Sequence, residues 1–365
     1  MSGTPATVHD LEPLRGNYPA IRPTITTPRS RSGLLSDVLA ACAPAGVGAP
    51  SPTVAPTPSP TLPPPETKAI RLAPGPCDAP LFAAETERFL QEEGFTDIQL
   101  TTSGGVAGLV DGKADLAAMF IPTLAAAVDA GSPIVCIGGL HYGCAEIWAP
   151  QGVNTLKDLR GRTVVVRSKA PADLAYSFMA IGLKNAGVEP SEVNFVVQAD
   201  ADLTKLFLEG KSDLLFLATT AAFAFKTNTA NKGRLVLDQA MEAPWSQQNC
   251  CSITTTTAWL QANPIAAKRA LRAIYRTADS LPKDRADAAK YATGKGLFGG
   301  AANTEVVRGA ANMVPYEWRE DFGDSVRFHA KLLSGVGLLK LSADDTVTKG
   351  TNLRFAKELA KELKR

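Results

Sequence analysis

The chain has 365 residues and a formal net charge of +2, and 45% of its residues are hydrophobic. This length is enough for one or two α/β domains with substantial cores. The near-neutral charge argues against a nucleic-acid surface, because such surfaces concentrate Lys and Arg. No apolar run reaches the roughly 18 residues that a membrane-spanning helix needs.

The N-terminal part of the chain has the composition of a tether. Residues 43–65 are mostly Pro, Ala, Thr, Ser and Gly, and such a segment cannot bury a core. The sequence Leu39-Ala40-Ala41-Cys42 stands just before it and resembles a bacterial lipobox, in which the Cys becomes the lipidated N-terminus of the mature protein. We therefore expect residues 1–41 to be a signal-like segment, Cys42 to be lipidated, and residues 42–67 to form a Pro-rich tether.

A second interpretation of this leader stays open. Arg29 and Arg31 precede a short run, residues 33–41, in the basic, apolar, small order of a signal peptide. Asp37 interrupts that run, and the residues before Arg29 carry no export pattern, which would fit a true start further along the chain. The alternative is an N-terminal tail in which Leu39-Ala40-Ala41-Cys42 occurs by chance. The tether directly after the Cys favours a lipoprotein, anchored at the periplasm or cell surface.

From residue 68 onward, short apolar runs alternate with helical segments. The expected strands are residues 68–72, 98–102, 116–121, 133–137, 163–166, 193–197 and 214–217. The expected helices are residues 81–93, 103–110, 122–130, 171–186, 203–209 and 357–365. Such alternation predicts an α/β fold with mainly parallel sheets flanked by helices. Ligands in these folds bind beyond the carboxyl ends of the strands.

Residues 158–197 predict a strand–loop–helix–strand unit, whose crossover implies a parallel pair of strands. Pro171 lies near the start of the helix and Gly187 just past its end, where each residue is favoured. One buried helical face is predicted at Leu174, Phe178 and Ile181. The loop Arg167-Ser168-Lys169 lies at a helix N-terminus, which presents free N–H groups and the positive end of the helix dipole. It is either an anion site or a solvated, capped turn.

A helix, a Gly-Lys-x-Asp turn and an apolar strand follow one another twice. The turns are Gly112-Lys113-Ala114-Asp115 and Gly210-Lys211-Ser212-Asp213. Two such cycles predict two similar lobes that face each other across a cleft. Residues 218–220 are expected to be the loop after the last of these strands.

Further motifs follow in a fixed order along residues 68–365. Besides the two turns they are His141-Tyr142-Gly143-Cys144-Ala145-Glu146-Ile147, Asp158-Leu159-Arg160-Gly161-Arg162 with residues 163–166, Ala186-Gly187-Val188-Glu189-Pro190 with residues 193–197, Pro244-Trp245-Ser246-Gln247-Gln248-Asn249-Cys250-Cys251, and Trp259-Leu260-Gln261-Ala262-Asn263-Pro264. In this order and spacing the chain resembles the solute-binding proteins of ABC importers, in the nitrate/sulfonate/taurine and thiamine-pyrimidine-precursor superfamily.

The resemblance implies a two-lobed, type II periplasmic-binding-protein-like α/β fold, joined by crossing hinge strands that close on ligand. It places residues 68–150 and 245–365 in lobe I and residues 151–244 in lobe II. The implied function is that of a monomeric binding protein, not an enzyme, which delivers a nitrate-, sulfonate- or taurine-like anion or a pyrimidine-like compound to a membrane permease. The alternative is a pyrimidine-precursor synthase of the same fold, because such enzymes use an active-site His and a cysteine-rich segment, which His141 and Cys250-Cys251 superficially match.

The candidate ligand-binding residues lie in loops after the expected strands and at the lobe boundary. They are Pro76, Cys77, Ser103, Gly104, Gly105, Pro122, Thr123, His141, Ser168, Lys169, Thr219, Thr220 and Trp245. Their hydroxyl and loop N–H groups could hold a small oxyanion, or a heteroaromatic ring could stack on Trp245. Phe216 is also placed to line the cleft. Asp78, Asp173 and Asp202 could oppose an anion or bind a cation.

Cysteines and histidines carry the remaining hypotheses. An exported protein can form disulfides, and by the resemblance the strand with Cys144 lies beside the strand with Cys250 and Cys251. We expect Cys144 to pair with one of these two and pin the hinge, or all three to be small buried residues. His141 either faces the cleft or is a hydrogen-bonded structural residue. No zinc spacing, Walker loop or Gly-x-Ser-x-Gly motif is present, so we expect neither metal nor cofactor.

Overall fold

The computed structural model of the chain describes residues 63–228, 232–318 and 322–363. The signal-like segment, the lipidation site Cys42 and most of the tether lie outside the described residues. Residues from Pro60 onward form one unit. Among the described residues of this unit, no helix has the length and apolar character needed to cross a membrane.

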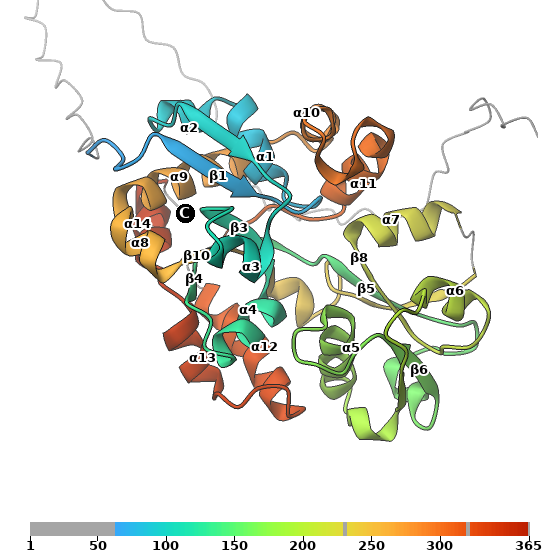
Figure 1. Cartoon of the computed structure of the whole chain (residues 1–365). Coiled ribbons are helices and arrows are strands. Elements are labelled where there is room, and N and C mark those ends of the chain that lie inside the picture. Colours follow the sequence, from blue (N-terminus) through green and yellow to red (C-terminus); the bar gives the residue numbers. More distant parts are fainter. Residues whose placement is uncertain (1–62, 229–231, 319–321, 364–365) are drawn as a thin grey trace, which may run out of the picture. The chain divides into compact units, whose positions relative to one another are not determined.

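The first lobe is built on a five-stranded sheet (Figure 1). Its strands, in spatial order, are β2 (Asp97–Leu100), β1 (Ala69–Ala73), β3 (Leu116–Phe120), β10 (Asn249–Thr256) and β4 (Ile134–Tyr142). β1 runs parallel to β2 and β3, whereas β10 runs antiparallel to β3 and β4. β10 returns from the second lobe, and it therefore enters this sheet in the opposite direction.

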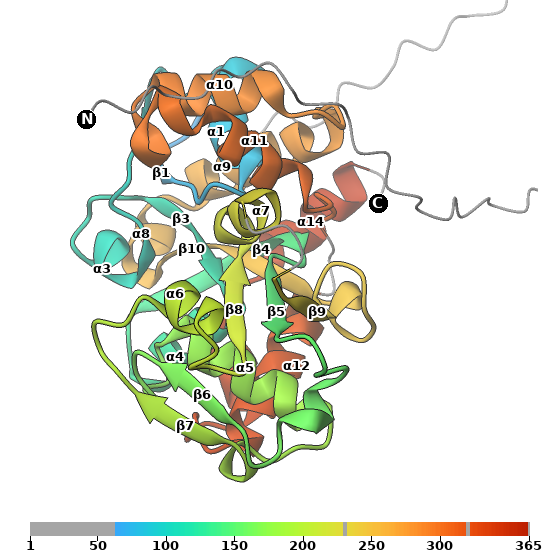
Figure 2. The ribbon, with the colours of Figure 1, turned by 90° about the vertical axis from the view of Figure 1, so that its right-hand side faces the viewer.

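The second lobe carries two smaller sheets (Figure 2). An antiparallel sheet contains β8 (Leu215–Ala218), β5 (Ala145–Ala149) and β9 (Arg234–Asp238), and a parallel pair contains β6 (Thr163–Val166) and β7 (Asn194–Val197). The parallel pair is the one that the predicted crossover required. The two-lobed α/β fold is confirmed, but the sheets are not mainly parallel. The five-stranded sheet is mixed and the three-stranded sheet is antiparallel, because the crossing strands β10 and β5 run against their neighbours.

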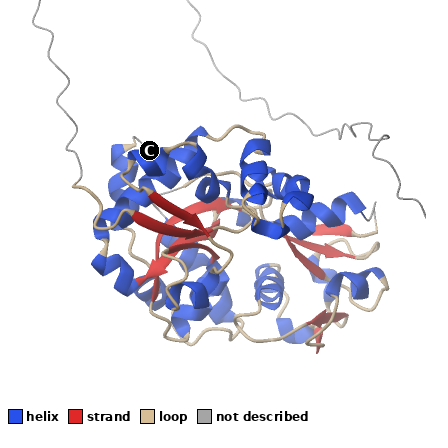
Figure 3. Ribbon diagram, turned by 45° about the horizontal axis from the view of Figure 1, so that its top comes forward, coloured by secondary structure: helices blue, strands red, loops and turns tan. Residues whose placement is uncertain are grey.

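Helices cover the sheets of both lobes (Figure 3). They are α1 (Ala79–Thr86), α2 (Phe89–Glu92), α3 (Gly105–Val110), α4 (Ile121–Asp129), α5 (Leu174–Asn185), α6 (Leu203–Leu208), α7 (Thr219–Asn228), α8 (Thr257–Ala262), α9 (Pro264–Ser280), α10 (Ala286–Gly294), α11 (Thr304–Asn312), α12 (Phe322–Gly335), α13 (Ala343–Gly350) and α14 (Arg354–Glu362). α1 packs against α9 and α10, and α12 packs against α4, α5 and α13. Of the helical face that the sequence predicted in α5, Phe178 and Ile181 are buried and Leu174 is half-buried.

The helix expected over residues 81–93 is in fact two helices, because Arg88 between them adopts a left-handed conformation with φ +61°. After this break the chain turns so that the buried carboxylate of Glu93 meets the guanidinium of Arg272 at 2.7 Å. A charged residue at the left-handed position gives no sequence signal for such a break, because glycine is the usual occupant.

The helix of residues 158–197 starts later than its proline predicted. Asp173 is the N-cap of α5 and its side chain accepts the backbone N–H of Tyr176, so Pro171 lies before the helix. The predicted loop at residues 218–220 is also shorter, because α7 begins directly at Thr219. α7 therefore begins directly after β8, whereas the loop between β6 and α5 is longer than predicted.

The two Gly-Lys-x-Asp turns have the same structural role in the two lobes. Gly112 and Gly210 have φ values of +67° and +70°, which lets each end the helix before it. The carboxylate of Asp115 accepts a backbone N–H of β1 at 2.8 Å, and that of Asp213 accepts one of β6 at 3.1 Å. Each aspartate therefore joins the turn before one strand, β3 or β8, to an earlier strand of the same lobe, β1 or β6.

Two chain segments cross between the lobes. β4 continues into β5 through Gly143 and Cys144, and β9 leads to β10 through a 3-10 turn at Trp245–Gln247. A Cβ atom on Gly143 would collide with the backbone of Ala240, so this crossing requires glycine. A disulfide joins Cys144 to Cys250, with the Cα atoms 6.4 Å apart, and thus links the two crossings covalently.

Candidate functional site

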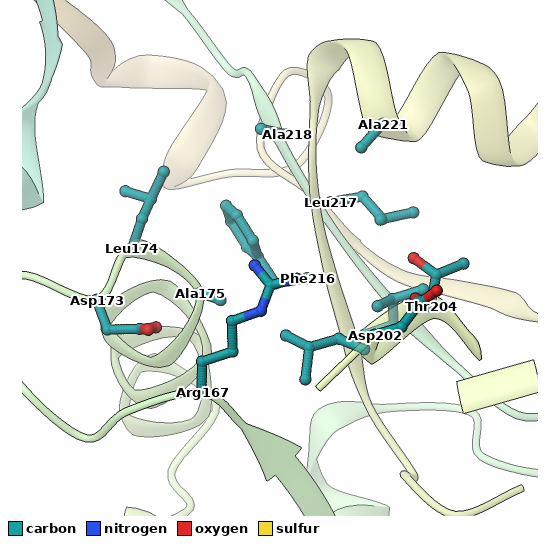
Figure 4. A pocket seen from close by; sticks show the side chains of 12 residues that line it. Arg167, Asp173, Leu174, Ala175, Asp202, Thr204, Phe216, Leu217, Ala218 and Ala221 are labelled. Atoms are coloured by element: carbon teal, nitrogen blue, oxygen red, sulfur yellow. The ribbon is translucent and has the colours of Figure 1, made fainter. Parts of the chain in front are cut away.

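A pocket of about 350 Å³ lies in the second lobe, near the carboxyl ends of β6 and β8 and the N-termini of α5 and α6 (Figure 4). It is lined by Arg167, Asp173, Leu174, Ala175, Asp202, Leu203, Thr204, Leu215, Phe216, Leu217, Ala218 and Ala221. This is the edge of the sheet at which α/β folds bind ligands.

Arg167 supplies the positive charge of the pocket. It directly follows β6, and its Nε–H donates to the carbonyl oxygen of Ala201 at 3.0 Å. Among the described residues, the two terminal guanidinium nitrogens have no further hydrogen-bond partner. In Figure 4 the guanidinium lies beside the ring of Phe216. A guanidinium with free N–H groups in a fixed orientation can bind an oxyanion through two parallel hydrogen bonds.

Asp173 and Asp202 line the same pocket, but each has a structural role as a helix cap. Asp173 accepts the backbone N–H of Tyr176 at 2.8 Å, and Asp202 accepts that of Lys205 at 3.0 Å. Side-chain caps of this kind stabilise helix N-termini. Their presence is therefore explained without a bound cation, and their charges partly offset that of Arg167.

An aromatic ring forms the apolar part of the pocket. Phe216 stacks on Phe178, with the ring centroids 5.4 Å apart and an interplanar angle of 15°. Figure 4 places it between Leu174 on α5 and Leu217 on β8. The pocket thus combines one cation with an apolar wall, which suits an organic anion.

Phe216, Asp173 and Asp202, which the sequence placed at the cleft, line this pocket, whereas the predicted ligand-binding residues of the neighbouring loops flank it. The hydroxyl of Ser168 accepts a backbone N–H two residues further on at 3.0 Å, and Lys169 is exposed. Thr219 is buried and Thr220 half-buried in the first turn of α7. Arg167 is the residue of the loop after β6 that lines the pocket. A role of Ser168 and Lys169 in ligand binding stays a prediction.

The predicted residues of the first lobe lie in three separate loops, none of which lines the pocket of the second lobe. Pro76 precedes α1, Ser103 and Gly104 precede α3, which starts at Gly105, and Pro122 and Thr123 lie in the first turn of α4. Gly104 packs against Ala73, and the backbone N–H of Ser103 donates to the hydroxyl of Thr101 at 3.0 Å. Their role in ligand binding stays a prediction.

A second polar cluster lies where the lobes join. The ring of His141, at the end of β4, is fully buried, and the side chain of Asp78 is 3% exposed. The Nε2 atom of His141 lies 2.9 Å from Oδ1 of Asp78, and its Nδ1 atom lies 3.0 Å from the carbonyl oxygen of Tyr142. Oδ2 of Asp78 accepts the backbone N–H of Gly75 at 2.7 Å. Both nitrogens of the ring face acceptors, which favours the doubly protonated imidazolium.

Sulfur atoms surround this histidine. A ring nitrogen of His141 and the sulfur atoms of Cys77, Cys144 and Cys251 all lie within 4.8 Å of one another. The Cys144 and Cys251 sulfurs are 3.6 Å apart. Cys77 and His141 were predicted together as ligand residues, and the structure brings them together in a buried cluster. Tyr316, which has no sequence signal, closes it by donating its hydroxyl to the carbonyl of Cys77 at 2.7 Å.

The groups of this cluster shift each other's pKa values. A hydrogen bond from Cys251 lowers the pKa of Cys77 to about 6, and the bond from His141 adds to the effect, against burial and the charge of Asp78. Burial lowers the pKa of His141, but its bonds to Asp78 and Cys77 outweigh this and raise it to about 9. Burial and the bond to Cys77 hold the pKa of Cys251 well above its usual range. The lowered pKa of Cys77 and the raised pKa of His141 both favour a pair of thiolate and imidazolium.

The sulfur atoms and ring nitrogen are close enough together to suggest a metal site, but two of these four groups are already engaged. The sulfur of Cys144 is bonded to Cys250, and both nitrogens of His141 face hydrogen-bond acceptors. In this arrangement the cluster favours sulfur chemistry over metal coordination.

Trp245 lies at the second crossing and is buried within an aromatic cluster. Its ring packs against Phe328 and His329, with centroid distances of 5.2 and 5.9 Å. It does not line the pocket of the second lobe. In this conformation the ring available to a ligand is Phe216, and Trp245 packs where α12 meets the crossing.

A family model, described as NMT1/THI5 like, matches residues 76–288, which is more than half of the chain. The chain belongs to this family. No match was found among curated proteins.

Solved structures support the fold. The alkanesulfonate-binding protein SsuA from Xanthomonas axonopodis pv. citri has 18% identity and a TM-score of 0.58, over 76% of this chain and 96% of that chain. The periplasmic nitrate-binding protein NrtA from Synechocystis PCC 6803 has 15% identity and a TM-score of 0.62, over 82% and 90%. The periplasmic aliphatic sulphonate binding protein SsuA from Escherichia coli has 14% identity and a TM-score of 0.62, over 78% and 92%. At these identities the similarity concerns the fold.

Proposed function

We propose that this chain is the extracytoplasmic solute-binding component of an ABC importer. The two-lobed fold and the family support this function, and sulfonate- and nitrate-binding proteins share the fold. The observation that carries the proposal is the pocket of the second lobe, where Arg167 has free guanidinium N–H groups beside Phe216. The ligand that fits is a small organic anion, with its acidic group on Arg167 and its apolar part on the aromatic ring.

Binding would work through lobe closure. A ligand seated on the second lobe gains further contacts when the first lobe closes over it, and this difference in contacts shifts the population toward the closed form. The predicted loops of the first lobe, with Ser103, Gly104 and Thr123, would supply those contacts. A membrane permease then receives the ligand from the closed, monomeric protein, which is held at the membrane by a lipid on Cys42.

A synthase-like enzyme of the same fold is the second candidate. The thiolate, imidazolium and carboxylate of Cys77, His141 and Asp78 favour it, because such groups can act in nucleophilic catalysis. However, Cys77 is only 4% exposed and His141 is fully buried. A reacting group needs access to its substrate, so the open pocket at Arg167 supports binding better than the closed cluster supports catalysis.

Thermal stabilisation by ligands tests the binding function. The full-length protein would be screened against aliphatic and aromatic sulfonates, taurine, nitrate, bicarbonate and pyrimidines. A ligand at about 100 times its Kd should add about 2.7 kcal/mol to the free energy of unfolding. Arg167→Ala should abolish that gain, and the neighbouring cation Lys169, replaced by Ala, is the matched control that should keep it. Gains that survive in Arg167→Ala would place the site elsewhere, and no stabilisation by any anion would count against the proposal.

The anchor is tested separately. Globomycin-sensitive incorporation of palmitate that disappears in Cys42→Ala would support a lipoprotein. An unlabelled cytosolic protein that converts a pyrimidine precursor would support the enzyme instead.

A further inference from the structure

Three cysteines compete for one disulfide at the lobe junction. Cys144 is bonded to Cys250, yet the sulfur of Cys251 lies only 3.6 Å from that of Cys144. All three are buried. Thiol–disulfide exchange proceeds by attack of a thiolate on one sulfur of a disulfide, and here the third sulfur is already in contact with its target.

A β-bulge explains how adjacent residues can both reach Cys144. In a regular strand, consecutive side chains point to opposite faces of the sheet. The pairing of β10 with β4 shifts register between Asn249 and Cys251 and again between Cys251 and Ser252. Such an irregularity reorients side chains, and it allows both vicinal cysteines to approach the same partner.

The surroundings supply a proton acceptor and a place for the leaving thiol. The sulfur of Cys77 and a ring nitrogen of His141 lie within 4.8 Å of the sulfur of Cys251, and the pKa of Cys77 is lowered at this position. On the other side, the sulfur of Cys250 lies 3.8 Å from Oε1 of the buried Gln239, an acceptor suited to a freed thiol. The reactant and product forms are therefore both provided with hydrogen-bond partners.

We infer that Cys144 exchanges its disulfide partner between Cys250 and Cys251, with Cys77 as the base. Cys251 gives its proton to the thiolate of Cys77, and its sulfur attacks that of Cys144. The Cys144–Cys251 bond forms as the Cys144–Cys250 bond breaks, and Cys250 leaves with the electron pair. The proton then passes to Cys250. One S–S bond replaces another, so no external oxidant or reductant is consumed.

The exchange changes how the two crossings are linked. Cys144 lies between β4 and β5, whereas Cys250 and Cys251 lie in consecutive positions of β10. Moving the bond from Cys250 to Cys251 shifts the attachment point on β10 by one residue. The distance between the β4–β5 crossing and the β9–β10 crossing then changes as well. This inference does not depend on the proposed function, because it follows from the sulfur geometry alone.

The test locates the free thiol of the vicinal pair. Native full-length protein is treated with iodoacetamide, quenched in acid and digested, and fragment ions are read that separate Cys250 from Cys251. Only molecules with Cys144 unlabelled are counted. We expect label on Cys251 in one population and on Cys250 in another. Label on Cys251 alone would overturn the inference.

Variants check the partner and the base. Cys250→Ser should retain one disulfide, now between Cys144 and Cys251, and its complete loss would contradict the inference. After a brief reduction and reoxidation, the ratio of Cys250 to Cys251 labelling should approach its final value about tenfold more slowly in Cys77→Ser, because the attacking thiolate forms less often. Cys136→Ser, at another buried cysteine outside the cluster, should leave this rate unchanged. An unchanged rate in Cys77→Ser would remove Cys77 from its assigned role. If that variant does not fold, the wild-type labelling still decides whether exchange occurs.

Discussion

The lobe junction and the pocket of the second lobe handle polar groups in opposite ways. At the junction, Asp78 and His141 are out of contact with water and satisfy each other at 2.9 Å. In the pocket, the guanidinium of Arg167 is exposed and bound by one hydrogen bond, and the aspartates are fixed by helix ends. The junction therefore holds its charges for structure and sulfur chemistry, whereas the pocket leaves a charge available to a ligand.

Breaking the buried pair should have the largest effect on stability. His141→Leu leaves the carboxylate of Asp78 buried without its partner, and loss of one member of a buried pair costs about 3–5 kcal/mol. Urea unfolding would measure the change. His329→Leu is the matched control, because burial lowers the pKa of this second buried histidine to about 4 and no described residue forms an ion pair with it. Equal losses in the two variants would mean that the charge of His141 contributes nothing.

Opening the disulfide should have the next largest effect. Cys144→Ala removes a link between residues 106 positions apart. A native disulfide of this kind stabilises by about 2–4 kcal/mol, mainly by constraining the unfolded chain. The free energy of unfolding should fall by that amount in the absence of reductant. In dithiothreitol the wild type and the variant should differ by far less, and a difference that persists there would point to packing at Cys144 instead.

The lobe junction and the pocket of the second lobe also differ in how far the sequence could predict them. Strand and helix alternation, the crossover of residues 158–197 and the two Gly-Lys-x-Asp turns are local signals, and they led to the correct two-lobed fold. The loop after β6 was singled out in the same way, because a strand followed by a helix N-terminus is a local pattern, and its role in ligand binding stays a prediction. The direction of Arg167 within that loop was not predictable, since it depends on the carbonyl of Ala201 on another segment.

The junction was hidden for a different reason. Asp78 and His141 are 63 residues apart, and Tyr316 reaches Cys77 from 239 residues away. Contacts of this range have no periodicity in the sequence. Trp245 illustrates the same limit, because an aromatic residue at a crossing suits ligand stacking as well as core packing, and its burial against α12 decides between them only in the folded chain.

The opposite pKa shifts of His141 and Cys77 predict how the free energy of unfolding depends on pH. The raised pKa of His141, about 9 against 6.5, adds stability that is complete below pH 6.5 and lost as the pH rises through 9. The lowered pKa of Cys77, about 6 against 9, adds stability that is complete above pH 9 and lost as the pH falls through 6. Between these limits folding moves one proton from the thiol to the imidazole, so the two slopes cancel.

Cys77→Ser should reveal the pH dependence of the free energy of unfolding that comes from His141. The serine does not titrate, and Asp78 still raises the pKa of the histidine. The free energy of unfolding should therefore fall by on the order of 2 kcal/mol from pH 6.5 to 9 in the variant, while the contribution of the cluster stays level in the wild type. Unfolding by urea across this range measures both. A falling curve in the wild type with the same slope would show that Cys77 is not a thiolate.

The smallest expected effect concerns Asp202 in the pocket of the second lobe. Two variants separate its role as the N-cap of α6 from the effect of its charge on the pocket. Asp202→Ala removes the acceptor for the backbone N–H of Lys205 and should cost about 1 kcal/mol, as lost N-caps do. Asp202→Asn keeps an acceptor oxygen and should remain close to the wild type in stability.

Because it removes a negative charge from the pocket of Arg167, Asp202→Asn should also bind an organic anion more tightly, by about 0.5 kcal/mol at low salt. Calorimetric titration with a sulfonate identified in the screen measures this gain, which should shrink as salt is added. A weaker affinity in Asp202→Asn would instead make the carboxylate a ligand contact, and the pocket would then be built for a zwitterion such as an aminosulfonate.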